Sequence, residues 1–144
     1  MLKALTVRLW WPDLIVAFAQ EDATICLTRC RARIVQDDSI RRPALPNNTD
    51  GIDVAGHNIH VHDIDVWNQD DTIAVKDGSQ NMLFERINAS GVGLTIGSIG
   101  ASQAHTCVRN ITFRDSVMHN TFKGIYMKSR PASAGETGEI SDVL

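Results

Sequence analysis

The chain has 144 residues, of which 43% are hydrophobic and 22% charged, and its formal net charge at pH 7 is -3. These proportions are those of a soluble folded protein. The lack of a basic excess argues against a nucleic-acid partner, and no apolar run reaches the roughly 20 residues that a membrane span needs.

Residues 1–45 form an N-terminal segment with little clear periodicity. The segment leads into a basic, proline-marked stretch at 41–46, which is typical of extended backbone. No functional feature stands out in it. The sequence therefore divides into two regions, 1–45 and 46–144, and we expect the regular structure in the second.

The second region carries a repeat. Three segments, at 58–61, 81–84 and 110–113, each begin with asparagine and continue with apolar residues at alternate positions. The offsets between them are 23 and 29 residues, and twelve positions after each segment stands an isoleucine: Ile73, Ile96 and Ile125. Such repetition indicates one structural unit that is used several times.

The pattern within each unit favours strands that stack. Alternating apolar residues bury one face of a short strand, and stacked units bury a continuous apolar column that one unit cannot close alone. We therefore predict an all-β fold, a parallel β-solenoid with three short strands per coil. A leucine-rich repeat fits less well, because its dense leucine pattern is absent. Residues 138–144 begin another strand without a cap, so we expect a truncated fragment of a longer solenoid.

Acidic residues recur at the spacing of the coils. Asp50 precedes Asp71 by 21 residues, close to one coil, and equivalent positions on successive coils lie about 4.8 Å apart. Asp50 is therefore expected beside the pair Asp70 and Asp71. Neighbours in a regular strand point to opposite faces, so the chain must bend if both members of the pair serve one site.

Three crowded carboxylates suit the cleavage of a glycosidic bond. Like charges raise the pKa of at least one member, which can then donate a proton, while another stays ionised and activates water. An inverting glycosidase usually separates the two by roughly 6.5–9.5 Å. A solvated acidic edge, a calcium-like oxygen cluster and a purely structural solenoid remain alternatives to catalysis.

Four ordered motifs carry a family resemblance. They lie at 48–51 (NTDG), 68–71 (NQDD), 91–98 (GVGLTIGS) and 124–128 (GIYMK). In order and interval they resemble the motif set of the polygalacturonases, glycoside hydrolase family 28. The resemblance covers roughly residues 43–144 and implies a right-handed parallel β-helix.

The resemblance also implies residue roles. Asp70 would be the general acid, and Asp50 and Asp71 would hold and activate the water as base. Lys128 would bind a substrate carboxylate, and the substrate-binding set would further include Tyr126 and Gln69. No metal or other cofactor is implied.

Two positions depart from the family pattern. Val92 stands where the family usually has histidine in its Gly-His-Gly motif, and Tyr126 stands where it has arginine in Arg-x-Lys. Valine holds no proton, and tyrosine cannot pair bidentately with a carboxylate. The departures imply an altered pectic substrate, repositioned catalytic helpers or lost activity.

The resemblance thus implies a hydrolase of α-1,4-galacturonosyl linkages in pectin that acts by inverting acid–base catalysis. The alternative is a catalytically inactive pectin-binding β-helix fragment. The implied partner is the polysaccharide, with no nucleic acid or membrane, for a monomer that works outside the cell.

Three histidines and one tryptophan could also form sites. His57, His60 and His62 are interpreted as an exposed histidine row rather than as metal ligands. Trp67 is next to the acidic motif and could stack on a sugar, but its place in a strand favours packing in the core.

Overall fold

The computed structural model describes residues 3–5, 15–16, 23–26, 50–100, 105–131 and 135–144. These ranges contain strands only: β1 Lys3–Leu5, β2 Ile15–Val16, β3 Ala23–Cys26, β4 Ile52–Val54, β5 His57–Trp67, β6 Ile73–Val75, β7 Gln80–Ser90, β8 Leu94–Ile99, β9 His105–Arg114, β10 Val117–Met118, β11 Ile125–Ser129 and β12 Thr137–Val143. No helix long and apolar enough to cross a membrane occurs within them.

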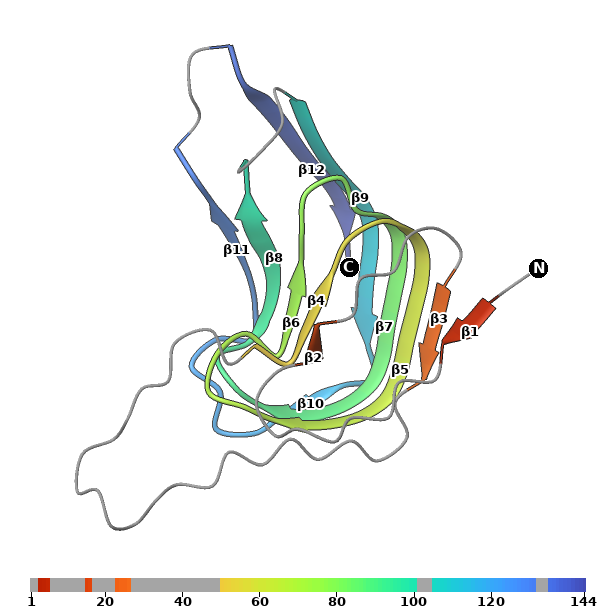
Figure 1. Cartoon of the computed structure of the whole chain (residues 1–144). Helices are drawn as coiled ribbons and strands as arrows, with labels where there is room; N and C mark the ends of the chain where they lie inside the picture. Colours follow the sequence, from red (N-terminus) through yellow and green to blue (C-terminus); the bar gives the residue numbers. More distant parts are fainter. Residues whose placement is uncertain (1–2, 6–14, 17–22, 27–49, 101–104, 132–134) are drawn as a thin grey trace.

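The strands form two sheets in which every pair is parallel. One sheet has the order β1-β3-β5-β7-β9-β12 with β10 beside β7, and the other has the order β11-β8-β6-β4-β2. From β4 to β9 the chain alternates between the two sheets, so each coil contributes one strand to each (Figure 1). The fold is the expected all-β, right-handed parallel β-helix.

Each long strand covers two sides of a coil. The strands β5 and β7 run for 11 residues each and curve around the coil (Figure 1). The alternation of buried residues in β5 shifts phase at Asp63, which has a φ of 57°, and the equivalent Arg86 has a φ of 54°. The three expected strands per coil therefore occur as one short strand and one bent, long strand.

The asparagine that opens each repeat has a structural reason. Asn58, Asn81 and Asn110 have φ values of 58°, 56° and 54°, a left-handed conformation that asparagine tolerates better than most residues. Their amides form a ladder, in which Asn81 Nδ2 donates to Asn58 Oδ1 over 3.1 Å and Asn110 Nδ2 donates to Asn81 Oδ1 over 2.9 Å. The ladder ties successive coils together outside the core.

The core is the apolar column that the repeat predicts. Val61, Phe84 and Phe113 pair in register, and the two phenylalanine rings stack with centroids 4.9 Å apart and planes 19° apart. Phe84 is fully buried. Fully burying an aromatic or aliphatic side chain contributes about 1.5–3 kcal/mol, so the stacked column stabilises coils that are too small to fold alone.

The second sheet departs from the predicted register. Ile73 pairs with Leu94 and Leu94 with Ile125, whereas Ile96 pairs with Val75. Ile96 is therefore not equivalent to Ile73 and Ile125, although each of the three follows its repeat by twelve residues. The cause is the connection before the short strand, which comprises residues 68–72 in one coil and only residues 91–93 in the next.

The prediction that Trp67 packs in the core was wrong. Its side chain is 43% exposed and stacks on His119, with ring centroids 5.8 Å and planes 11° apart. Its Nε1 donates to Asp65 Oδ1 over 2.8 Å. Val66 points into the core, and alternation along the strand turns the next side chain outward.

The histidine row joins an ion cluster on the outer face of the first sheet. His57 is exposed, whereas His60 and His62 are partly buried. His60 Nε2 lies 3.0 Å from Oε1 of Glu85, a buried carboxylate that also pairs with Arg114 and Arg86. Among the described residues, no group of three metal-ligating side chains includes a histidine of this row.

Candidate active site

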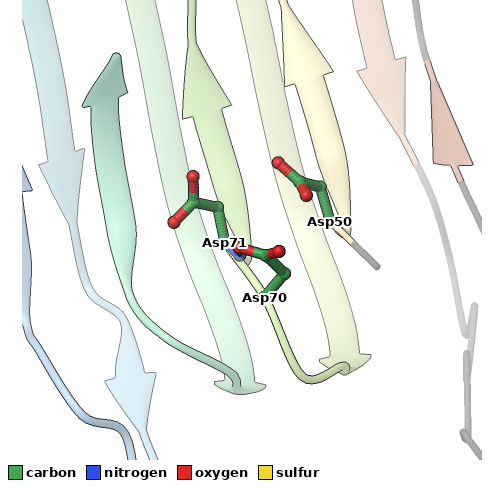
Figure 2. Close-up of side chains that lie close together, drawn as sticks. All are labelled: Asp50, Asp70 and Asp71. Carbon is green, nitrogen blue, oxygen red and sulfur yellow. Dashed lines mark hydrogen bonds between the residues drawn. The ribbon is translucent and has the colours of Figure 1, made fainter. Parts of the chain in front are cut away.

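The spacing of the aspartates places them next to one another before adjacent strands, as predicted. The N–H of Gly51 donates to the carbonyl of Asp71 over 2.8 Å, and Ile52 pairs with Ile73. Asp50 and Asp71 therefore occupy equivalent positions before β4 and β6. Figure 2 shows Asp50, Asp70 and Asp71 grouped at the starts of these two strands.

The expected bend between the paired aspartates is present at residues 69–70. The amide of Asn68 donates to the carbonyls of both Asp70 and Asp71 over 2.9 Å each. Oδ1 of Asp70 accepts the N–H of Asp71 over 2.9 Å. The bend lets consecutive side chains reach one site, which a regular strand prevents.

Sequence reasoning gave Asn68 no role, although the residue lies within the acidic motif. Asparagine characteristically hydrogen-bonds the backbone two residues on, and this is the signal that could have identified it. Gly91 of the next coil packs against it, because a Cβ there would lie 2.3 Å from Asn68 Oδ1 and 2.8 Å from the Asp70 carbonyl oxygen.

Asp71 is fully buried and held by two donors from β11. The hydroxyl of Tyr126 donates to Oδ1, and Nζ of Lys128 donates to Oδ2 over 2.5 Å. A buried carboxylate is unfavourable unless such partners compensate its lost hydration. The ammonium that the resemblance assigned to a substrate carboxylate is thus paired with a carboxylate of the protein.

The donors reach Asp71 because glycine lets the strands meet closely. The strands β6, β8 and β11 are neighbours in the second sheet. A Cβ at Gly97 would lie 2.3 Å from the carbonyl oxygen and 2.6 Å from Cγ of Lys128. The path of Lys128 therefore depends on the absence of a side chain at Gly97.

Electrostatics distinguish Asp50 within the cluster. Burial, then the neighbouring carboxylates of Asp53, Asp70 and Asp71, raise its pKa to about 6, against an opposing effect of Lys76. The cluster can therefore hold a proton well above the usual range of aspartate.

The two donors of Asp71 also have raised pKa values. Burial and the hydrogen bond to Asp71 raise the pKa of Tyr126. For Lys128, burial lowers the pKa, but the hydrogen bond and the charge of Asp71 outweigh it and raise the pKa. Both side chains therefore keep their protons, and Lys128 keeps its positive charge, around neutral pH.

The three carboxylates are closer together than the usual inverting arrangement. One oxygen from each of Asp50, Asp70 and Asp71 lies within 4.8 Å of the others, below the roughly 6.5–9.5 Å expected for an inverting pair. The short distance follows from their positions on adjacent strands and on consecutive residues. Among the described residues, this is also the one group of three ligating side chains close enough to share a cation.

The remaining predicted positions lie around this cluster. Gln69 is exposed in the bend beside Asp70. Val92 is partly buried, and its N–H donates to the carbonyl of Asp70 over 2.8 Å. The structure therefore gives Val92 a backbone role at the bend, while its side chain offers no polar group.

Comparison with known proteins agrees with this fold. The sequence profile of the glycosyl hydrolases family 28 matches residues 17–144. The chain belongs to this family. An endopolygalacturonase of Emericella nidulans is 39% identical over 108 residues, a match that covers 74% of this chain and 27% of that protein. A probable rhamnogalacturonase E of Aspergillus flavus is 41% identical over 97 residues, 66% of this chain and 20% of that protein.

Two solved structures share the fold of this chain. Endopolygalacturonase I of Stereum purpureum, complexed with two galacturonate, is 26% identical with a TM-score of 0.64, covering 86% of this chain and 37% of that one. An endo-xylogalacturonan hydrolase of Aspergillus tubingensis, 22% identical with a TM-score of 0.62, shares the fold over 85% of this chain and 32% of that one. The chain thus spans about a quarter of the curated relatives' length and about a third of these structures.

Proposed function

We propose that this chain carries the catalytic centre of a hydrolase that cleaves α-1,4-galacturonosyl linkages of pectin by inverting acid–base catalysis. One observation carries the proposal: buried Asp71, held by Lys128 and Tyr126, lies beside Asp50 and Asp70 in one carboxylate cluster. Membership of family 28 and the polygalacturonases among the relatives support the same reaction.

In the proposed reaction Asp70 donates a proton to the glycosidic oxygen as the bond from the anomeric carbon breaks. A water held by Asp50 and Asp71 attacks that carbon from the opposite side and gives up a proton to Asp50. The ion pair with Lys128 keeps Asp71 negatively charged. This negative charge then stabilises the positive charge that develops on the sugar.

We expect inversion because of the hydrogen bonds that Asp71 accepts, and not because of the distance between the carboxylates. Both of its oxygens accept a hydrogen bond from the protein, which weakens either as a nucleophile toward carbon. Water is then the better attacking group. Proton NMR of the first-formed reducing end tests for inversion. The anomer opposite to that of the substrate is expected, whereas the same anomer would show a covalent glycosyl-enzyme intermediate.

The alternative is a catalytically inactive pectin-binding β-helix fragment. It is favoured by Val92 and Tyr126, neither of which supplies the proton-tuning or bidentate group of the family pattern. Both readings share a polysaccharide partner, and both fit a monomer that acts outside the cell.

Release of reducing ends from polygalacturonate separates the two readings. The purified chain is compared with its Asp70→Asn variant. The matched control is Asp115→Asn, which changes an exposed aspartate directly after β9. Activity that disappears only in Asp70→Asn supports the hydrolase. Retained binding without turnover in all three proteins supports the inactive binder.

A further inference from the structure

Lys123 lies in line with the acidic bend along the direction in which the coils stack. Its N–H donates to the carbonyl of Val92 over 2.8 Å, and the N–H of Val92 donates to the carbonyl of Asp70 over 2.8 Å. The three positions therefore follow one another on successive coils. Two steps of strand spacing place the Lys123 backbone roughly 9–10 Å from that of Asp70.

The backbone at Lys123 is fixed against the preceding coil. The hydroxyl of Thr121 lies 2.7 Å from the carbonyl oxygen of Lys123 and 2.8 Å from that of Val92. A Cβ at Gly93 would lie 2.7 Å from the carbonyl oxygen of Lys123. The turn that presents this lysine is thus a packed part of the solenoid.

The side chain of Lys123 stands over the ring of Tyr126. Its Nζ lies 4.1 Å from the ring centroid, and Nζ of Lys128 lies 6.0 Å from the same centroid. The two ammonium groups differ in one respect. Lys128 is paired with Asp71, whereas Lys123 is exposed and forms no ion pair with any residue that the structure describes.

We infer that Lys123, positioned by the face of Tyr126, is a second anion-binding site that takes the carboxylate of a uronic acid residue of the substrate. Among the described residues beside the cluster, Lys128 is paired with Asp71 and Lys76 with Asp53, so Lys123 supplies the positive charge that is available to the substrate. The aromatic face favours a cation at this position, and an ammonium binds a carboxylate as a point charge without a bidentate geometry.

This inference rests on the proposed function and explains one departure from the family pattern. With tyrosine at position 126 the site lacks the guanidinium of the family pattern, but the same ring contacts an ammonium contributed three residues earlier. The positive charge is then moved along the chain rather than lost. A substrate with carboxylates next to the cleaved bond remains compatible with the site.

The test is calorimetric titration of an oligogalacturonate into the chain carrying Asp70→Asn, which prevents turnover. Adding Lys123→Gln should weaken binding about tenfold at low salt, the typical effect of one charge-assisted hydrogen bond, and Lys123→Arg should restore most of it. Arg109→Gln removes the same charge from the other sheet, where Arg109 Nε donates to Gln80, and should leave affinity unchanged.

A neutral oligosaccharide with the carboxyl groups reduced to alcohols completes the design. Lys123→Gln should then bind as tightly as its parent. Equal affinities of Lys123→Gln and its parent for oligogalacturonate would overturn the Lys123 site while leaving the proposed function intact. An equal loss for charged and neutral ligands would also overturn it. A parent that binds neither ligand would overturn both proposals.

Discussion

The hydroxyl of Tyr126 donates to a carboxylate oxygen of Asp71, which lies 55 positions earlier in the chain. Lys128 completes the environment of the same carboxylate. We therefore propose that Tyr126, which stands where the family pattern has arginine, positions Asp71 in this chain.

Replacing Tyr126 by phenylalanine tests that role. The change removes one donor from a fully buried carboxylate, which is expected to lower the free energy of unfolding by about 1–3 kcal/mol. In the proposed hydrolase kcat should fall by about tenfold, a loss equivalent to about 1.4 kcal/mol. Urea denaturation and initial rates measure the two effects. Unchanged stability and kcat would show that Asp71 does not need the hydroxyl.

Gly91→Ala should damage the site through the bend. The new Cβ would approach Asn68 Oδ1 to 2.3 Å and Thr72 Oγ1 to 2.5 Å, so the amide that positions Asp70 and Asp71 must move. A displacement of about 1 Å in a catalytic group costs about a hundredfold in rate. Gly124→Ala is the matched control, since no atom lies within 4 Å of its added Cβ. Equal rates in the two variants would contradict the proposed role of Asn68.

The pH dependence of hydrolysis should reflect Asp50. Its pKa is raised to about 6 by burial and by neighbouring carboxylates. As the proposed base, Asp50 is protonated and inactive below that pH, so kcat/KM should fall as pH decreases through about 6. Rates across pH 4 to 8 check this. Activity that falls as pH rises through 6 would instead identify Asp50 as the acid.

The same shift makes stability depend on pH. Between its unfolded pKa of 3.8 and its folded pKa of about 6, Asp50 binds a proton only in the folded chain, so its contribution is full below 3.8 and is lost as pH rises through 6. Asp50→Asn does not titrate. Relative to the wild type, this variant should gain about 1–2 kcal/mol between pH 4 and 7, after allowance for solvent screening.

Thermal or urea unfolding of wild type and Asp50→Asn at both pH values measures this difference. The matched control is Asp63→Asn, because hydrogen bonds from Arg86 and His62 lower the pKa of Asp63. That control should show the opposite trend, with the wild type gaining stability relative to the variant as pH rises from 2 to 5. If the stability of both variants relative to the wild type changed in the same direction as pH rises, the raised pKa of Asp50 would be ruled out as the cause.

Much of the fold could be predicted from the repeat. The asparagines at 58, 81 and 110 and the apolar column of Val61, Phe84 and Phe113 identified the coils, because left-handed backbone and core packing both constrain residue type locally. The same periodicity failed for Ile96, since it carried no information about the shorter connection at 91–93. The prediction that Trp67 is buried was wrong for a different reason: it rested on the place of Trp67 in a strand, and strand propensity does not specify which face is buried.

The sequence by itself determined that Asp50 and the pair Asp70 and Asp71 would meet, because their spacing is close to one coil and coils stack at a fixed distance. Only the tertiary structure decided the state of these groups. The bonds from Tyr126 and Lys128 to Asp71, and the burial that raises the pKa of Asp50, arise between coils. Hydrogen bonding and desolvation depend on every neighbour in space, and no local pattern of residues encodes them.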